Sequence, residues 1–116
     1  MKCLVTGASG FIGNALVHRL CNQDHEVIGL THKQDPPKKH PKATYITADI
    51  VYPDDQLKEA CKTVDVVFHC AAFVKDYGPK KLFYEINEKK KKNLVNLCKD
   101  SINRFVFLSH IPYEKV

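Results

Sequence analysis

The chain of 116 residues lacks the long apolar run that a membrane-spanning helix needs. Its N-terminus also lacks the pattern of a signal peptide, because the first apolar run is short and glycines interrupt it. With 44% hydrophobic and 27% charged residues, the composition is that of an ordinary globular protein. We therefore expect one cytoplasmic domain over residues 1–116, large enough for a real core and without a membrane partner.

The chain also lacks closely spaced cysteine pairs. It has five cysteines, an odd number, and no Cys-x-x-Cys pair occurs. The simplest interpretation is a set of reduced, mostly buried thiols in a cytosolic protein, with no metal site. The cysteines are Cys3, Cys21, Cys61, Cys70 and Cys98.

Aromatic residues do not interleave with the basic stretches, which argues against a nucleic-acid-binding role for the positive charge. The formal net charge is +5, and much of it comes from residues 36–42 and 89–92. A basic patch can bind nucleic acid, but no nucleic-acid-binding motif accompanies these lysines. We interpret the first stretch as a proline-rich surface loop and the second as a solvated helix face, and we expect no nucleic-acid partner.

What the sequence does contain is a glycine pattern near its start, GASGFIG at residues 7–13, between a short apolar run and a run with helical spacing. A strand, a glycine turn and a helix start are together typical of a dinucleotide-binding site. Gly7 permits the turn, Gly10 lets a pyrophosphate approach the backbone, and Gly13 lets the helix lie against the strand. The N–H groups at the helix N-terminus attract phosphate. The alternative is a glycine-rich turn in an α/β fold that has lost its ligand.

Apolar periodicity predicts strands that alternate with helices along the whole chain. This alternation predicts an α/β fold, a Rossmann-type three-layer sandwich with a parallel five-stranded sheet of order 3-2-1-4-5. The near-continuous apolar run at 64–69 fits a strand covered on both faces. Strands are expected at 2–6, 25–31, 44–47, 64–69 and 104–109, and helices at about 11–22, from about 53, and at about 81–100.

Several motifs of this chain have the order and spacing that are found in a known group of enzymes. They are residues 6–13, 25–27, 49–50, 64–72 and 104–109. In these motifs the chain resembles the extended short-chain dehydrogenase/reductases, which include the NAD-dependent epimerase/dehydratases. The nearest branch is that of the dihydroflavonol reductases and 3β-hydroxysteroid dehydrogenases, and the resemblance covers essentially the whole chain. It implies the dinucleotide-binding portion of an oxidoreductase.

The resemblance also implies a set of cofactor-binding residues. A carboxylate such as Asp49 can accept a hydrogen bond from the exocyclic amino group of adenine, although it can equally cap a turn. Cys70 is more simply a buried small side chain without a reactive role, and His69 has the spacing of a structural histidine. The implied set is Gly7, Ser9, Gly10, Phe11, Ile12 and Gly13 at the pyrophosphate, Asp49 and Ile50 at the adenine, Cys70, Ala71 and Ala72 at the nicotinamide ribose, and Ser109 after the last strand.

Cofactor choice depends on the end of the strand at 25–31. An acidic residue there would bind the ribose hydroxyls of NAD, but this chain has Thr31, His32 and Lys33 instead. In relatives an arginine that selects NADP falls at about the position of His32. We therefore expect NADP as the cofactor, with His32 and Lys33 near its 2′-phosphate, and NAD remains possible.

The catalytic residues of the family have no counterpart in this chain. In relatives a tyrosine and a lysine four residues apart follow the fifth strand, and the tyrosine acts as acid and base. No such pair follows that strand here, and His110 stands near the place of the catalytic serine or threonine. We expect a chain truncated after the fifth strand that is not catalytic by itself. The alternatives are a stand-alone dinucleotide-binding or regulatory module and a decayed relative.

The fifth strand raises an expectation about partners. Residues 105–108 have the composition of an interior parallel strand, and residues 111–116 are too few for a crossover and a further strand. An open apolar edge invites pairing with another chain. We expect self-association, or a partner chain, at this edge.

Overall fold

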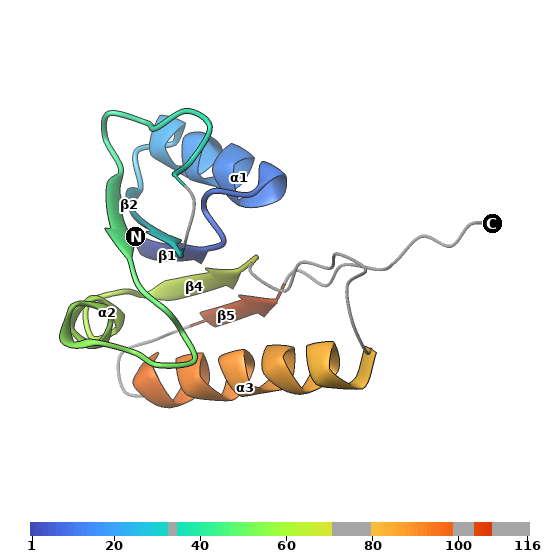
Figure 1. The fold of residues 1–116 in the computed structure, drawn as a ribbon. Helices are drawn as coiled ribbons and strands as arrows, with labels where there is room; N and C mark the ends of the chain where they lie inside the picture. The colour runs from blue at the N-terminus through green and yellow to red at the C-terminus, as the bar shows by residue number, and fades with distance from the viewer. Residues whose placement is uncertain (33–34, 71–79, 99–103, 108–116) are drawn as a thin grey trace.

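The computed structural model describes residues 1–32, 35–70, 80–98 and 104–107. Within them, strands and helices alternate, and the strands form one parallel sheet of order β3-β2-β1-β4-β5 (Figure 1). The predicted fold class and strand order are therefore confirmed. The elements are β1 (Lys2–Thr6), α1 (Phe11–Asn22), β2 (Glu26–Thr31), β3 (Thr44–Thr47), α2 (Asp55–Cys61), β4 (Val66–His69), α3 (Lys80–Cys98) and β5 (Arg104–Phe107).

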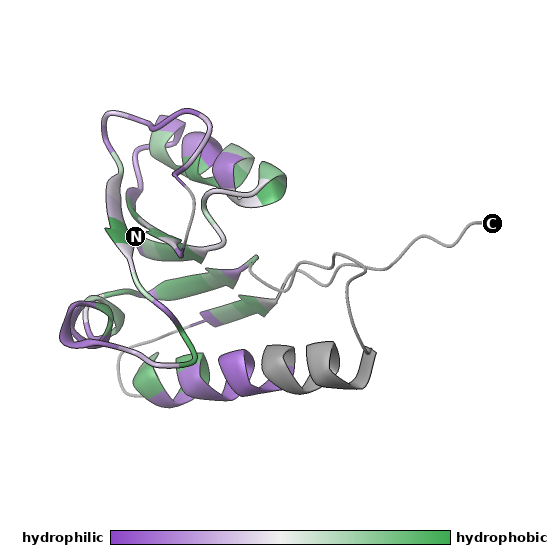
Figure 2. Cartoon of the chain, in the orientation of Figure 1, coloured by the Kyte–Doolittle hydropathy of each residue, from purple (hydrophilic) through white to green (hydrophobic). Residues whose placement is uncertain are grey.

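Helices cover both faces of the sheet, which explains the continuous apolar runs in its strands. Helix α1 lies on one face, and α2 and α3 lie on the other (Figure 1). Successive strand residues point to opposite faces, so Val5 packs in the cluster with α1, whereas Leu4 packs in the cluster with α2 and α3. Figure 2 shows the hydrophobic strands between these layers.

The layered arrangement fixes where a ligand can bind. Strand β1 pairs with β2 on one side and with β4 on the other, and Thr6 at its end lies opposite both Leu30 and His69. In chain order β1 is followed by α1, which lies on one face, and β4 is followed by α3, which lies on the other (Figure 1). The carboxyl ends of β1 and β4 therefore border the point where the strand order reverses, which is where ligands bind in open α/β sheets.

Small differences from the expected boundaries have local causes. Helix α2 begins after Asp54, whose carboxylate accepts a hydrogen bond from the Leu57 N–H at 2.9 Å, as an N-cap does. The strand expected from residue 64 begins at Val66: the Asp65 N–H still donates to the Lys2 carbonyl at 2.7 Å, but the Lys2 N–H donates to the Asp65 carboxylate at 3.0 Å and not to a backbone carbonyl. The ends expected for the last helix and the last strand, at residues 99–100 and 108–109, lie outside the described residues.

Two expectations from composition can be compared with the described residues. None of the five cysteines is in a disulfide, and four of them are buried. In the described part of the chain, no helix has both the length and the apolar character needed to cross a membrane.

Candidate functional site

Two of the three glycines after β1 are required by the fold itself. Gly7 has a φ of 67°, a conformation that side chains disfavour. A Cβ at Gly13 would lie 2.1 Å from the Gly7 carbonyl oxygen, so only glycine lets α1 approach the turn this closely. Both residues have the roles that their spacing predicts.

Gly10 is different, because none of the described residues requires a glycine there. Its φ of −81° and ψ of 170° suit any residue, and an added Cβ would lie 3.4 Å from the Gly7 carbonyl oxygen, an ordinary contact. Gly10 is exposed and stands at the N-cap of α1, where no side chain caps the helix. As far as the described residues are concerned, a side chain would thus fit at the N-cap of α1, and the sequence has none.

The first turn of α1 presents its backbone beside this N-cap. The N–H groups of Phe11, Ile12 and Gly13 have no partner within the helix, because the first turn of any helix lacks preceding carbonyls. Phe11 and Ile12 are 90% and 57% exposed, and no acidic residue occupies the first turn. The partial positive charge of the helix end is therefore not neutralised locally, and an anion would be favoured there.

A buried contact joins the ends of β1 and β4 beside the glycine turn. The Thr6 hydroxyl accepts a hydrogen bond from the Cys70 N–H at 3.0 Å and lies 2.7 Å from His69 Nδ1. Burial lowers the pKa of His69 to about 4, and the positive charges of Lys90 and Lys91 act in the same direction. His69 is therefore neutral at pH 7, and its contacts fit the structural role expected for it.

Cys70 follows His69 at the same edge of the sheet. Burial raises the pKa of its thiol to about 11, so the nucleophilic thiolate is scarce at neutral pH. This agrees with the interpretation of Cys70 as a small packing residue. Within the described ranges, no group of three or more histidine, cysteine or acidic side chains is placed to hold a metal ion.

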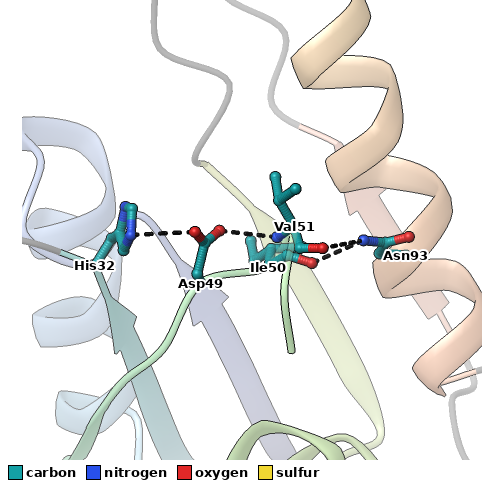
Figure 3. Close-up of polar contacts among 5 residues, drawn as sticks. All are labelled: His32, Asp49, Ile50, Val51 and Asn93. Atoms are coloured by element: carbon teal, nitrogen blue, oxygen red, sulfur yellow. Dashed lines mark hydrogen bonds and ion pairs between the residues drawn. The ribbon is translucent and has the colours of Figure 1, made fainter. Parts of the chain in front are cut away.

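A second set of polar contacts lies in the loop after β3 (Figure 3). One oxygen of Asp49 accepts from the Val51 N–H at 2.9 Å, and the other lies 3.5 Å from His32 Nε2. The side chains of Asp49 and His32 are 32% and 51% exposed. Asp49 thus caps a turn, which was the alternative to a binding role, and it also remains accessible beside the end of β2.

Asn93 on α3 completes this set of contacts, and the sequence analysis missed it. Its Nδ2 donates hydrogen bonds to the backbone oxygens of Ile50 at 2.9 Å and of Val51 at 3.3 Å (Figure 3). A signal was present in the sequence. Helical periodicity places Asn93 beside the buried Leu94, at the border of the apolar stripe, where an amide needs a hydrogen-bond partner.

The structure brings most of the expected site residues to one edge of the sheet, since the strands are parallel and all end there. They are Gly7, Ser9, Gly10, Phe11, Ile12 and Gly13 after β1, His32 after β2, Asp49 and Ile50 after β3, and Cys70 after β4. The expected site residues Lys33, Ala71, Ala72 and Ser109 lie outside the described residues.

The sheet order and the glycine turn define a Rossmann-type nucleotide-binding domain. The model of one family, the NAD dependent epimerase/dehydratase family, matches residues 3–110. The chain therefore belongs to the NAD-dependent epimerase/dehydratase family.

Individual relatives agree with this assignment. A 3-beta-hydroxysteroid dehydrogenase of Mycolicibacterium neoaurum is 32% identical over 114 residues, which cover 91% of this chain and 31% of that protein. MoeE5, solved with UDP-glucose and NAD, is 27% identical with a TM-score of 0.75, over 92% of this chain and 36% of that one. Bordetella bronchiseptica WbmH, solved with NAD+, is 25% identical with a TM-score of 0.70, over 90% and 37%. The chain spans about a third or less of the curated relatives it matches.

Proposed function

We propose that residues 1–116 bind an NAD-type dinucleotide along the carboxyl edge of the sheet, with its pyrophosphate over Gly10. The observation that carries this proposal is that, among the described residues, none requires a glycine at position 10. A side chain there would project into the space from which a phosphate reaches the first turn of α1. The NAD bound to MoeE5 and WbmH supports the same ligand class for this chain.

The adenine end would lie at the loop after β3. The Asp49 carboxylate can accept from the exocyclic amino group of adenine, and an adjacent backbone N–H can donate to a ring nitrogen. The Ile50 N–H is suited to that role, because it donates to no other described residue although Ile50 is only 5% exposed. An unpartnered N–H in a nearly buried residue fits a ligand that supplies the acceptor.

A serine in place of Gly10 tests the binding site with little risk to the fold. Gly10→Ser adds a side chain that the backbone tolerates, so we expect a folded protein whose affinity for NAD(H) falls by more than about tenfold. Ala15→Ser, an exposed change on the same helix, is the matched control. Isothermal titration calorimetry measures both. Unchanged affinity in Gly10→Ser, or no binding by the folded wild type to millimolar NAD or NADP, would overturn the proposal.

We further propose that NADP is preferred over NAD. His32 stands directly after β2, where an acidic residue would bind the ribose hydroxyls of NAD, and Lys33 follows it. A cationic side chain beside a 2′-phosphate stabilises the bound cofactor. The contact between His32 and Asp49 weakens this effect, because the carboxylate shares the region, so a modest preference is expected.

For the whole protein we propose a reductase or epimerase in which this domain holds the cofactor and the nicotinamide ring exchanges hydride with a substrate. Residues 1–116 alone are expected to have no turnover. The spacing Tyr-x-x-x-Lys does occur at Tyr77 and Lys81, but it precedes β5, whereas the family's pair follows that strand. Steady NADPH oxidation with ketones or aldehydes, dependent on this chain and abolished by Tyr77→Phe, would contradict the expectation.

A further inference from the structure

We propose that Asn93 is a positioning residue of the adenine subsite, fixing the loop after β3 so that Asp49 and the Ile50 N–H face the base. The proposal rests on the proposed function. It starts from the two hydrogen bonds from Asn93 to the backbone oxygens of Ile50 and Val51.

The first step is that these bonds connect the loop to a rigid element. A side-chain amide has two N–H protons and can serve two carbonyls at once. Asn93 does so across 43 residues to Ile50 and 42 to Val51, from within the 19-residue helix α3 (Figure 3). The loop is thereby attached to the helical layer that packs under the sheet.

The second step is that the loop is held on both sides of Asp49. Before it, the Ala48 N–H donates to the Thr31 carbonyl at 3.0 Å and extends the pairing with β2. After it, the Ile50 side chain is buried in the core, and its carbonyl faces Asn93. Asp49 therefore lies between two fixed points, and its carboxylate has little freedom to turn away from the end of β2.

The third step concerns the Ile50 N–H. In a trans peptide the N–H points opposite to the C=O of the preceding residue, and the Asp49 carbonyl accepts a hydrogen bond from the Tyr52 N–H at 3.1 Å. The Ile50 N–H is therefore directed away from the turn that Asp49 and Tyr52 close, and it donates to no other described residue. Asn93 holds the Ile50 and Val51 carbonyls of the same turn, and it would thereby fix the donor that reads a ring nitrogen.

A positioning role predicts an effect on recognition of the base, beyond any effect on stability. NAD and its hypoxanthine analogue, nicotinamide hypoxanthine dinucleotide, separate the two. Hypoxanthine presents an oxygen to Asp49 in place of an amino group, and its N1 carries a proton where adenine has an acceptor for the Ile50 N–H. The wild type should therefore prefer NAD by roughly tenfold or more.

The experiment compares Asn93→Ala with Asn96→Ala. Asn96 is an exposed asparagine three residues further along α3, so the two variants make the same change in the same helix. We expect Asn93→Ala to lower the affinity for NAD and to reduce the preference over the hypoxanthine analogue to about twofold or less. Asn96→Ala should retain the wild-type preference, and nicotinamide mononucleotide, which lacks adenine, should bind all three proteins alike.

A second variant covers the case in which Asn93→Ala does not fold. Asn93→Asp keeps the size of the side chain but cannot donate to carbonyls at neutral pH, so it should lose the same preference. If Asn93→Ala or Asn93→Asp is folded and retains the wild-type preference for NAD, the positioning role is wrong while the binding function stands. If the folded wild type binds neither dinucleotide, the binding function itself is wrong.

Discussion

The two loops that border the carboxyl edge of the sheet are built in opposite ways. The turn after β1 is shaped by the absence of side chains, through the positive φ of Gly7 and the close approach at Gly13. The loop after β3 is shaped by side chains. The Asp49 carboxylate accepts a hydrogen bond from the Val51 N–H, and the Asn93 amide donates to the Ile50 and Val51 carbonyls. A pyrophosphate carries no information about the base, whereas adenine is recognised by its own hydrogen-bonding groups. Each loop therefore suits the part of the ligand that we assign to it.

This difference predicts different costs of mutation. A steric requirement fails abruptly, because an added atom has no space, whereas a hydrogen-bonded loop loses its contacts one at a time. The glycine turn should therefore respond with large losses of stability at Gly7 and Gly13 and the loop after β3 with moderate, additive ones. Gly10 should follow neither pattern.

The largest effect is expected at Gly13. In Gly13→Ala the new Cβ would lie 2.1 Å from the Gly7 carbonyl oxygen, and α1 must shift from the sheet. We expect the free energy of unfolding, measured by urea denaturation, to fall by about 3 kcal/mol or more. A loss below about 1 kcal/mol would show that the turn adapts as readily as the loop after β3, and the comparison would lose its basis.

The next effect concerns pH and the buried contact between the Thr6 hydroxyl and His69 Nδ1. The pKa of His69 falls from 6.5 in the unfolded chain to about 4 in the folded one, so between these values the unfolded state binds more protons. Stability is therefore fully present above about pH 6.5 and is lost as the pH falls toward 4. Between about pH 7.5 and about pH 5, this group should remove about 2 kcal/mol.

His69→Asn supplies the comparison for that prediction, because its amide can still reach Thr6 but does not titrate in this range. Both proteins are denatured with urea at the two pH values. The difference between them removes the pH dependence that comes from the carboxylates they share. The wild type should lose about 2 kcal/mol more than the variant. Parallel pH dependence in the two proteins would mean that folding does not lower the pKa of His69.

A smaller effect is expected for cofactor choice near the loop after β3. Lys33→Glu should reverse a preference for NADP that we place at a few-fold to tenfold, on the order of 1 kcal/mol. Lys58→Glu makes the same charge change at an exposed position on α2 and should leave the preference as it is. Equal affinities for NADP and NAD in wild type and Lys33→Glu would remove the assignment of the 2′-phosphate to this position.

The smallest effect sharpens the comparison most. Gly10→Ser introduces a preferred N-cap residue at a position with suitable backbone angles, so its free energy of unfolding should stay level or rise by about 0.3 kcal/mol. The same substitution is expected to weaken cofactor binding. Stability and affinity would thus move in opposite directions at Gly10, whereas Gly13→Ala should lower both.

The sequence predicted the steric part of the site and, in the hydrogen-bonded loop, Asp49 and Ile50, but it did not predict Asn93, for a physical reason. Gly7, Gly10 and Gly13 are close in the chain, and their spacing alone describes the turn between a strand and a helix. Asn93 acts on Ile50 across 43 residues, and no local pattern records which loop a helix will face. The strand order was predictable because the alternation of elements leaves few topologies open to a parallel sheet.

The sequence predicted a separate role for each of the three glycines, but it could not show which of them the fold itself requires. The structure shows that a Cβ fits at Gly10 and not at Gly13. Asp49 is a similar case, since capping a turn and facing a ligand were alternatives in the sequence, whereas in the structure its two oxygens have different neighbours.

The missing cap at the start of α1 has a consequence for the dynamics of the protein. A helix whose first N–H groups lack acceptors frays at that end, and its amide hydrogens exchange readily with solvent. A phosphate held by those groups would act as the cap that Gly10 omits. Hydrogen exchange in the first turn of α1 would then slow on binding, and ligand at about a hundredfold excess over its Kd would raise the free energy of unfolding by about 2.7 kcal/mol. Binding of the cofactor would in this sense complete the folding of the helix.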